Sequence, residues 1–418
     1  MFTRYVFVLI AATSFASASF AAEESPDWNA TTLTGDWGGT RSSLYDKGLN
    51  VELNHKSDLL SNTSGGAARG AVVLMNSEAA VSMDLSKLAG WEGASAFIQY
   101  HVQHGNKSIN SYTGSFAGVS NIETGTSTGQ FYQAWLQKNS ADDSLSVLAG
   151  LYAIDSEFYV TDTSGLFLQP PYGMSAEMAQ TGQNGPPVFP MGALGVRVKY
   201  TGSGFYLQGA LTDGVPGNPN NPHGTHILLN QGDGTLAVAE LGYTPEGDKG
   251  TFNKTAIGFW RYSTQAVRDQ AIDPTNVDGL GNPLLHRDHG AYILAERTLM
   301  AEQGNPGQGL SGFIRFGVVN QDVYQADWSG SVGLNYQGLL DGRDDDAAGI
   351  AITTSHASGW YRQVMASVSS ETMIEMTYRA QLQPWLALQP TVQYIGNPSM
   401  APALKDAWVI GARAEITF

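Results

Sequence analysis

Charged side chains flank the longest stretch of the sequence that lacks a regular hydrophobic pattern, residues 158–192. Glu157 directly precedes this stretch, and Arg197 and Lys199 follow it in a segment of alternating apolar and polar residues. A carboxylate placed opposite a guanidinium or ammonium group can bind the paired hydroxyl groups of a solute. We therefore take Glu157, Arg197 and Lys199 as candidate binding residues of one site.

Further candidates lie on the polar side of other alternating segments. They are Glu240, Arg261, Glu296 and Arg315. Trp135 has the same parity as Gln133 and Gln137, so its ring could offer a flat stacking face to a solute. Two alternatives stay open. The charges could form a ladder that neutralises itself, and Trp135 could be an anchor at a membrane interface.

Motifs for catalysis or metal binding are weak. The adjacent pair Ser355–His356 has no identifiable third residue to orient it, and the sequence contains neither GxSxG nor HExxH. His223 and His226 lie in a stretch rich in Gly, Pro and Asn, and the aspartates at 344–346 lack the spacing of a calcium loop. We predict no catalytic residue and no metal site.

The candidate residues belong to segments in which apolar residues recur at every second position, which is the pattern of β-strands. In the last segment one side consists of Trp408, Ile410, Ala412, Ala414, Ile416 and Phe418. The pattern predicts an all-β fold of about 16 strands. The predicted strands are 48–60, 71–84, 93–103, 130–139, 145–157, 193–201, 204–213, 235–244, 251–264, 289–299, 310–320, 328–340, 347–356, 371–382, 386–395 and 407–418.

Alternating strands fit either a soluble sandwich or a transmembrane barrel. Many of the predicted strands reach ten residues or more, and Tyr and Trp recur near their ends, as in a membrane-spanning barrel. The composition agrees, with 49 glycines and only 14% charged residues. A closed antiparallel barrel with an even number of strands is the predicted architecture, and the terminal Phe418 is typical of bacterial outer-membrane proteins.

The chain divides into three parts. Residues 1–22 have a basic start, an apolar run and a small-residue end, which predicts a secretory signal peptide. Residues 23–47 should form an N-terminal periplasmic segment with one or two helical turns ended by Gly48. Residues 48–418 should form the barrel. Its longest loop, 158–192, contains two Pro-Pro pairs, and we expect it to fold inward as a constriction, with a plain surface loop as the alternative.

Charge and cysteine usage exclude other classes. The net charge of −16 argues against nucleic acid as a partner, because phosphates require a basic surface. The absence of cysteine excludes disulfide bonds and thiolate metal sites. The mature part of the chain has no run of 18 apolar residues, so no transmembrane helix is expected.

Four stretches resemble the OprB-type carbohydrate-selective porins. They are LTGDWGGTR at 33–41, GLYAIDSEF at 150–158, LGVRVKY at 194–200 and QPTVQYIGNP at 389–398. The resemblance spans the chain from about 33 to 418. It implies a 16-stranded channel in the outer membrane of a Gram-negative bacterium, surrounded by the lipids of that membrane. Monosaccharides such as glucose, and as an open alternative oligosaccharides, would diffuse through it without a cofactor.

Several alternatives remain at the level of sequence. A general, non-selective porin would show the same strands. An outer-membrane barrel enzyme would need a nucleophile with a histidine partner, and a secreted sugar-binding β-protein would be released into buffer rather than extracted with membranes. The sequence also leaves a monomer and a homotrimer equally open.

Overall fold

The computed structural model describes residues 26–105, 107–248 and 250–418. The predicted signal peptide, 1–22, lies outside these residues. Among the described residues, sixteen antiparallel strands form one closed barrel in which β1 pairs with β16, confirming the predicted architecture. The strands are β1 (Leu49–Gly66), β2 (Gly70–Asp84), β3 (Ala94–Gly105), β4 (Gly129–Asn139), β5 (Leu145–Tyr152), β6 (Ala193–Gly202), β7 (Phe205–Asp213), β8 (Thr235–Tyr243), β9 (Asn253–Val267), β10 (Leu285–Glu302), β11 (Asn305–Val319), β12 (Ala326–Gln337), β13 (Ala347–Ala357), β14 (Ser370–Gln383), β15 (Leu386–Gly396) and β16 (Lys405–Thr417).

Helices are short and lie between the strands or before them. They are α1 (Trp28–Thr31), η1 (Trp37–Gly39), α2 (Thr40–Asp46), α3 (Leu85–Ala89), α4 (Asn110–Thr113), η2 (Ile154–Ser156), η3 (Asp162–Leu166), η4 (Pro170–Tyr172), α5 (Ala176–Ala179), α6 (Gly359–Met365) and η5 (Pro398–Met400). No helix in the described ranges is long and apolar enough to cross a bilayer. The predicted helical turn before the barrel is α2, and it ends before Gly48, whose positive φ of 95° suits a residue without a Cβ.

The outer face of the barrel is apolar. In β8, for example, Leu241 and Ala239 alternate with the buried Val238 and Glu240. Aromatic pairs lie at both ends of the wall, such as Phe205–Tyr243 and Tyr394–Trp408 with centroids 4.5 and 5.1 Å apart. An apolar band bordered by aromatic rings is the surface that a lipid bilayer requires.

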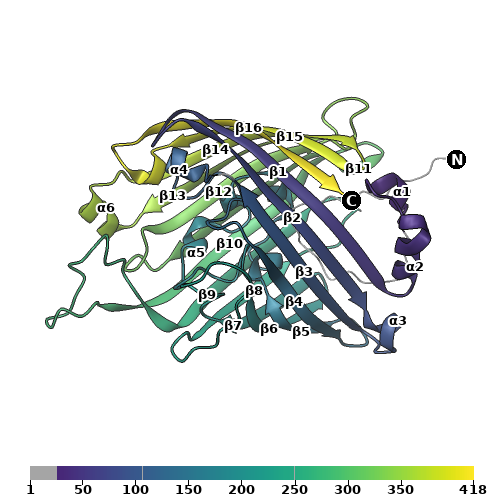
Figure 1. The fold of residues 1–418 in the computed structure, drawn as a ribbon, viewed down its shortest axis with the longest axis horizontal. Helices are drawn as coiled ribbons and strands as arrows, with labels where there is room; N and C mark the ends of the chain where they lie inside the picture. Colours follow the sequence, from purple (N-terminus) through teal and green to yellow (C-terminus); the bar gives the residue numbers. More distant parts are fainter. Residues whose placement is uncertain (1–25, 106, 249) are drawn as a thin grey trace.

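The two ends of the barrel differ in their connections. At the end where Phe418 lies beside α1 and α2, the strands are joined by short turns (Figure 1). At the other end the connections include 106–128, 153–192, 214–234 and 268–284. In outer-membrane barrels, short turns of this kind face the periplasm and long loops face the exterior.

Several predicted strand boundaries were wrong, and the first strand, expected to end at residue 60, continues to Gly66. The fifth strand was expected to reach residue 157, but β5 ends at Tyr152 because η2 turns the chain away from the wall. Glu157 is therefore a loop residue. The connection expected at 300–309 is much shorter, because β10 continues to Glu302 and β11 begins at Asn305.

The main apolar core lies inside the barrel. Phe158, Tyr159 and Met178 of the loop between β5 and β6 are fully buried and pack with wall residues that include Trp260 and Tyr292. Tyr159 stacks on Tyr292 with ring centroids 3.9 Å apart. The interior is thus partly filled by this loop, which leaves the remaining lumen to polar side chains.

Candidate functional site

The loop between β5 and β6 is held inside the barrel by carboxylates of the wall. Glu240 Oε2 accepts a hydrogen bond from Tyr159 N at 2.9 Å, and Glu296 Oε2 accepts one from Thr163 N at 2.8 Å. Glu375 accepts bonds from two successive backbone N–H groups, at 2.9 and 3.0 Å. These carboxylates satisfy N–H groups that have no partner in a sheet or a long helix.

A buried arginine satisfies carbonyl groups of the same loop. Arg315 of β11 donates from Nη2 to Tyr159 O at 2.8 Å and Gly173 O at 2.7 Å, and from Nη1 to Tyr172 O. Its guanidinium also lies 4.6 Å from the ring centroid of Tyr159. Nearby, Lys254 Nζ of β9 donates to Val160 O at 2.7 Å. Arg315 is fully buried, so it supports the loop and is not accessible to a solute.

A second loop also enters the barrel, which was not expected from the sequence. In residues 107–128, Ser120 Oγ donates to Asp58 at 2.7 Å, and Phe116 N donates to Glu371 at 2.7 Å. Asn121 N reaches Leu168 O of the first loop at 2.7 Å. The sequence shows that this connection is long. Its hydrogen-bond partners, however, are wall residues distant in the chain, and no local sequence pattern predicts them.

The charged group predicted around Glu157 is assembled in the structure. Arg197 Nε lies 2.8 Å from Glu157 Oε2, and Lys199 Nζ lies 3.9 Å from Glu157 Oε1. The exposed fractions of the side chains are 1% for Arg197, 10% for Glu157 and 30% for Lys199. Arg197 is further held by Ser146 Oγ at 2.7 Å and Gln137 Oε1 at 2.8 Å. Of the three, Lys199 is the group most accessible from the lumen.

Tyr206 adds an aromatic ring to this group. Lys199 Nζ lies 5.3 Å and Lys254 Nζ 5.7 Å from its centroid, so two cations lie beside one ring. Its hydroxyl donates to Glu240 Oε1 at 2.7 Å, which fixes the ring. Lys254 and Tyr206 were not predicted from the sequence. The inward position of Lys254 could have been inferred from its parity with the aromatic residues Trp260 and Tyr262 of β9.

The other predicted residues take different positions. Glu240 is buried under the loop and accepts from Tyr206, Gln208, Tyr292 and Tyr159, so its oxygens are occupied. Trp135 faces inward with the predicted parity, but its ring lies 5.3 Å from that of Phe97 and packs against the apolar core.

The inward orientation predicted for Arg261 is wrong. Arg261 is exposed and shares its parity in β9 with Phe259, which is 55% exposed on the outer face. The buried residues of β9 are instead Trp260 and Tyr262. The hydrophobic pattern misled the prediction because the inward loop packs against the wall, so aromatic residues occupy both faces of this strand.

Two buried carboxyl groups of the inward loop have raised pKa values. Burial raises the pKa of Asp155, although Tyr132 Oη at 2.5 Å and Phe189 N at 2.9 Å stabilise its charged form. Burial likewise raises the pKa of Glu177, which accepts from Tyr159 Oη at 2.8 Å and from Ser329 Oγ.

Within the described ranges, no group of three or more His, Asp or Glu residues is placed to hold a metal ion.

Comparison with known proteins agrees with this architecture. Residues 68–418 match the carbohydrate-selective porin, OprB family. The chain is 25% identical to Porin B of Pseudomonas aeruginosa, covering 98% of this chain and 96% of that protein. It is also 25% identical to the putative porin QuiX of Acinetobacter baylyi, over 92% and 93% of the two chains.

Solved structures show the same fold. The high-pH structure of Pseudomonas putida OprB superposes with a TM-score of 0.82 at 22% sequence identity, covering 93% of this chain and 99% of that one. The family match favours a carbohydrate porin over a general porin, and the family and barrel together indicate a channel rather than an enzyme. The chain belongs to the OprB family of carbohydrate-selective porins, which places it in the Gram-negative outer membrane as a passive sugar channel.

Proposed function

We propose that monosaccharides such as glucose cross the barrel along the wall that presents Lys199, Glu157 and Tyr206. The observation that supports this is the difference in exposure within the charged group. The Lys199 side chain is 30% exposed, whereas Arg197 is buried and holds Glu157 in an ion pair. An ammonium group and a carboxylate can hydrogen-bond sugar hydroxyls, and a tyrosine ring can pack on the C–H face. Such contacts are few and weak, so that the solute can leave again.

We also propose that the loop 158–192 is the constriction of the channel. Wall residues bind its backbone at separate points, with Glu240, Glu296 and Glu375 accepting and Arg315 donating. A loop bound in this way has one position in the lumen and therefore sets one fixed opening. The inward residues of 107–128, bound to it through Asn121, would narrow the opening further.

Residues 26–47 are proposed to close against the periplasmic rim. Arg41 donates to Phe418 O at 2.8 Å and to Val51 O at 2.7 Å, which ties the segment to the chain of both strands that meet at the barrel seam. Trp28 and Trp37 flank its guanidinium at 4.4 and 4.6 Å. A buried arginine that stacks on aromatic rings in this way would stabilise the junction of β1 and β16 that closes the barrel.

A liposome-swelling assay tests the proposed path. Wild-type protein should admit glucose faster than an amino acid of similar size, and Lys199→Ala should slow glucose more than the amino acid. Arg261→Ala is the matched control, because it removes a basic residue from the outer face of the barrel. Entry ordered by solute size alone, with no effect of Lys199→Ala, would refute the proposed path.

A further inference from the structure

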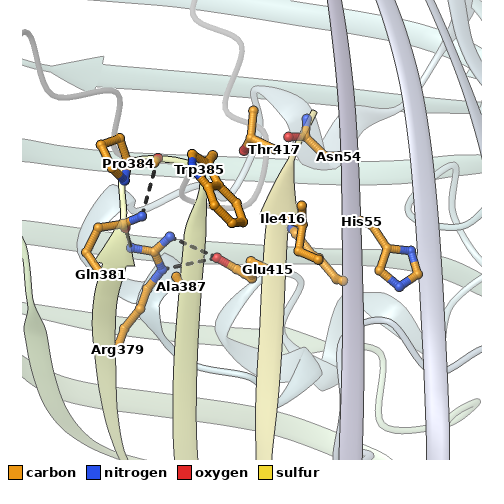
Figure 2. A pocket seen from close by; sticks show the side chains of 11 residues that line it. Asn54, His55, Arg379, Gln381, Pro384, Trp385, Ala387, Glu415, Ile416 and Thr417 are labelled. Atoms are coloured by element: carbon orange, nitrogen blue, oxygen red, sulfur yellow. Dashed lines mark hydrogen bonds and ion pairs between the residues drawn. The ribbon is translucent and has the colours of Figure 1, made fainter. Parts of the chain in front are cut away.

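A polar hollow lies on the wall formed by β14, β15, β16 and β1 (Figure 2). In the closed strand order β14 is eight strands from β6, so this wall faces the one that presents Lys199. The hollow forms over Ala387, whose neighbours in register are Gln381 on β14 and Glu415 on β16. The small side chain of Ala387 lies between these longer neighbours, and the hollow opens to solvent.

One carboxylate oxygen in this hollow is left free. Arg379 donates from Nε and Nη2 to Glu415 Oε2, at 3.1 and 3.0 Å, and from Nη1 to Gln381 Oε1 at 2.7 Å. Both donors reach the same oxygen, and Glu415 Oε1 accepts no hydrogen bond from residues 26–105, 107–248 or 250–418. Arg379 thus orients Glu415 and leaves an acceptor facing the hollow.

A cation lies next to that acceptor on the neighbouring strand. Lys56 of β1 is the register partner of Glu415, and within the described part of the chain its Nζ forms no hydrogen bond or ion pair. A carboxylate oxygen and an ammonium group on neighbouring strands match the vicinal hydroxyl groups of a sugar, one of which donates while the other accepts.

An indole ring borders the same hollow. Trp385 lies in the turn between β14 and β15, and Figure 2 shows its ring above the Arg379–Glu415 pair. Thr417 N donates to Trp385 O at 3.0 Å, so the turn is tied to β16. Trp385 is partly exposed, and its ring face could cover the C–H face of a pyranose.

We propose that this hollow is a second, weak binding subsite for a pyranose sugar on the periplasmic side of the constriction. Glu415 and Lys56 would bind adjacent hydroxyls, Arg379 would orient Glu415, and Trp385 would stack on the ring. The subsite rests on the proposed passage of sugars and extends it, since a solute released from the Lys199 wall would have a second weak site before it leaves the barrel.

Saturation-transfer NMR with glucose and the refolded mature protein in micelles tests this subsite, since it detects weak binding. The constriction contact is first removed with Lys199→Ala. In that background, Trp385→Ala and Glu415→Gln should each weaken the apparent affinity for glucose roughly threefold to tenfold. Trp408→Ala, which removes an exposed tryptophan from the outer face, should leave it unchanged.

The outcomes separate the two proposals. Equal glucose signals from Lys199→Ala and from the Lys199→Ala/Trp385→Ala variant would overturn the subsite, even if liposome swelling still favours glucose. If the wild-type protein shows no preference for glucose over the amino acid in the swelling assay, the proposed path is refuted instead. If Trp385→Ala does not fold, Lys56→Met provides the same test without altering the turn, and an unchanged affinity in that variant would equally overturn the subsite.

Discussion

Arg413 and Asp58 form a two-pronged ion pair across the seam where β16 meets β1, with Nε–Oδ1 and Nη2–Oδ2 distances of 2.7 and 2.8 Å. The two residues are direct register partners, and both are buried. Asp58 also accepts from Ser120, and Arg413 donates to Asn121 at 2.8 Å. The pair that closes the barrel therefore also positions the loop at 107–128.

Removal of one partner of this pair should destabilise the barrel. Asp58→Ala leaves the Arg413 guanidinium buried without its counter-charge, which costs about 3 kcal/mol or more of unfolding free energy. Urea unfolding in detergent micelles measures this loss. Lys405→Ala, at an exposed position of the same strand, is the control and should change the unfolding free energy little. Equal midpoints for the two variants would contradict a role for the pair in closing the seam.

Arg197 and Lys199 should have separable effects, because only Lys199 is accessible. Arg197→Ala removes three side-chain contacts at once and leaves Glu157 without its buried partner, so we expect lower stability and altered conductance for all solutes. Lys199→Ala should leave the unfolding midpoint nearly unchanged and slow sugar entry selectively. Parallel unfolding and swelling measurements on both variants test this. A selective sugar defect in Arg197→Ala without loss of stability would reverse the assignment.

Arg315→Lys should loosen the inward loop that we propose as the constriction. A guanidinium can donate to carbonyls in several directions at once, and Arg315 reaches those of Tyr159, Tyr172 and Gly173. A lysine ammonium has a different reach and shape and cannot reproduce this set. We expect higher single-channel conductance with more frequent current fluctuations in planar bilayers. Arg297→Lys, on the exposed face of β10, is the matched control and should behave as the wild type. An unchanged conductance for Arg315→Lys would show that the carboxylates alone hold the loop.

The strands could be predicted from sequence because the outer face must be apolar along its whole length. Sixteen alternating segments gave the correct strand number, and the group of Glu157, Arg197 and Lys199 was correctly brought together. The predictions for single side chains failed where the interior of the barrel is filled by packed protein instead of water. The burial of Arg197 depends on Gln137 from β4 and Ser146 from β5. The orientation predicted for Arg261 was wrong because apolar loop residues such as Met178 share a cluster with Trp260 and Tyr262, which gives β9 an apolar inner face.

Glu177 should make the stability of the inward loop depend on pH. It lies in α5 against β11 and β12, and the groups that face it are Tyr159, Ser329 and Arg315. Burial raises its pKa above the ordinary value of 4.5, although its hydrogen bonds and Arg315 oppose the shift. The folded loop therefore binds a proton more tightly than the unfolded chain does. As the pH falls through the raised pKa, Glu177 should stabilise the loop increasingly, and this gain is complete below the unfolded value.

Glu177→Gln isolates this contribution, because glutamine has the shape of the protonated side chain without its charge. At neutral pH the variant should unfold at a higher temperature than the wild type, since no charge has to be buried. The difference should shrink as the pH falls and vanish near pH 4. Other carboxylates titrate in both proteins, so the measured quantity is the difference between their thermal midpoints at each pH. A variant that is less stable than the wild type at neutral pH would show that the ionised carboxylate, through Tyr159 and Ser329, contributes more than its burial costs.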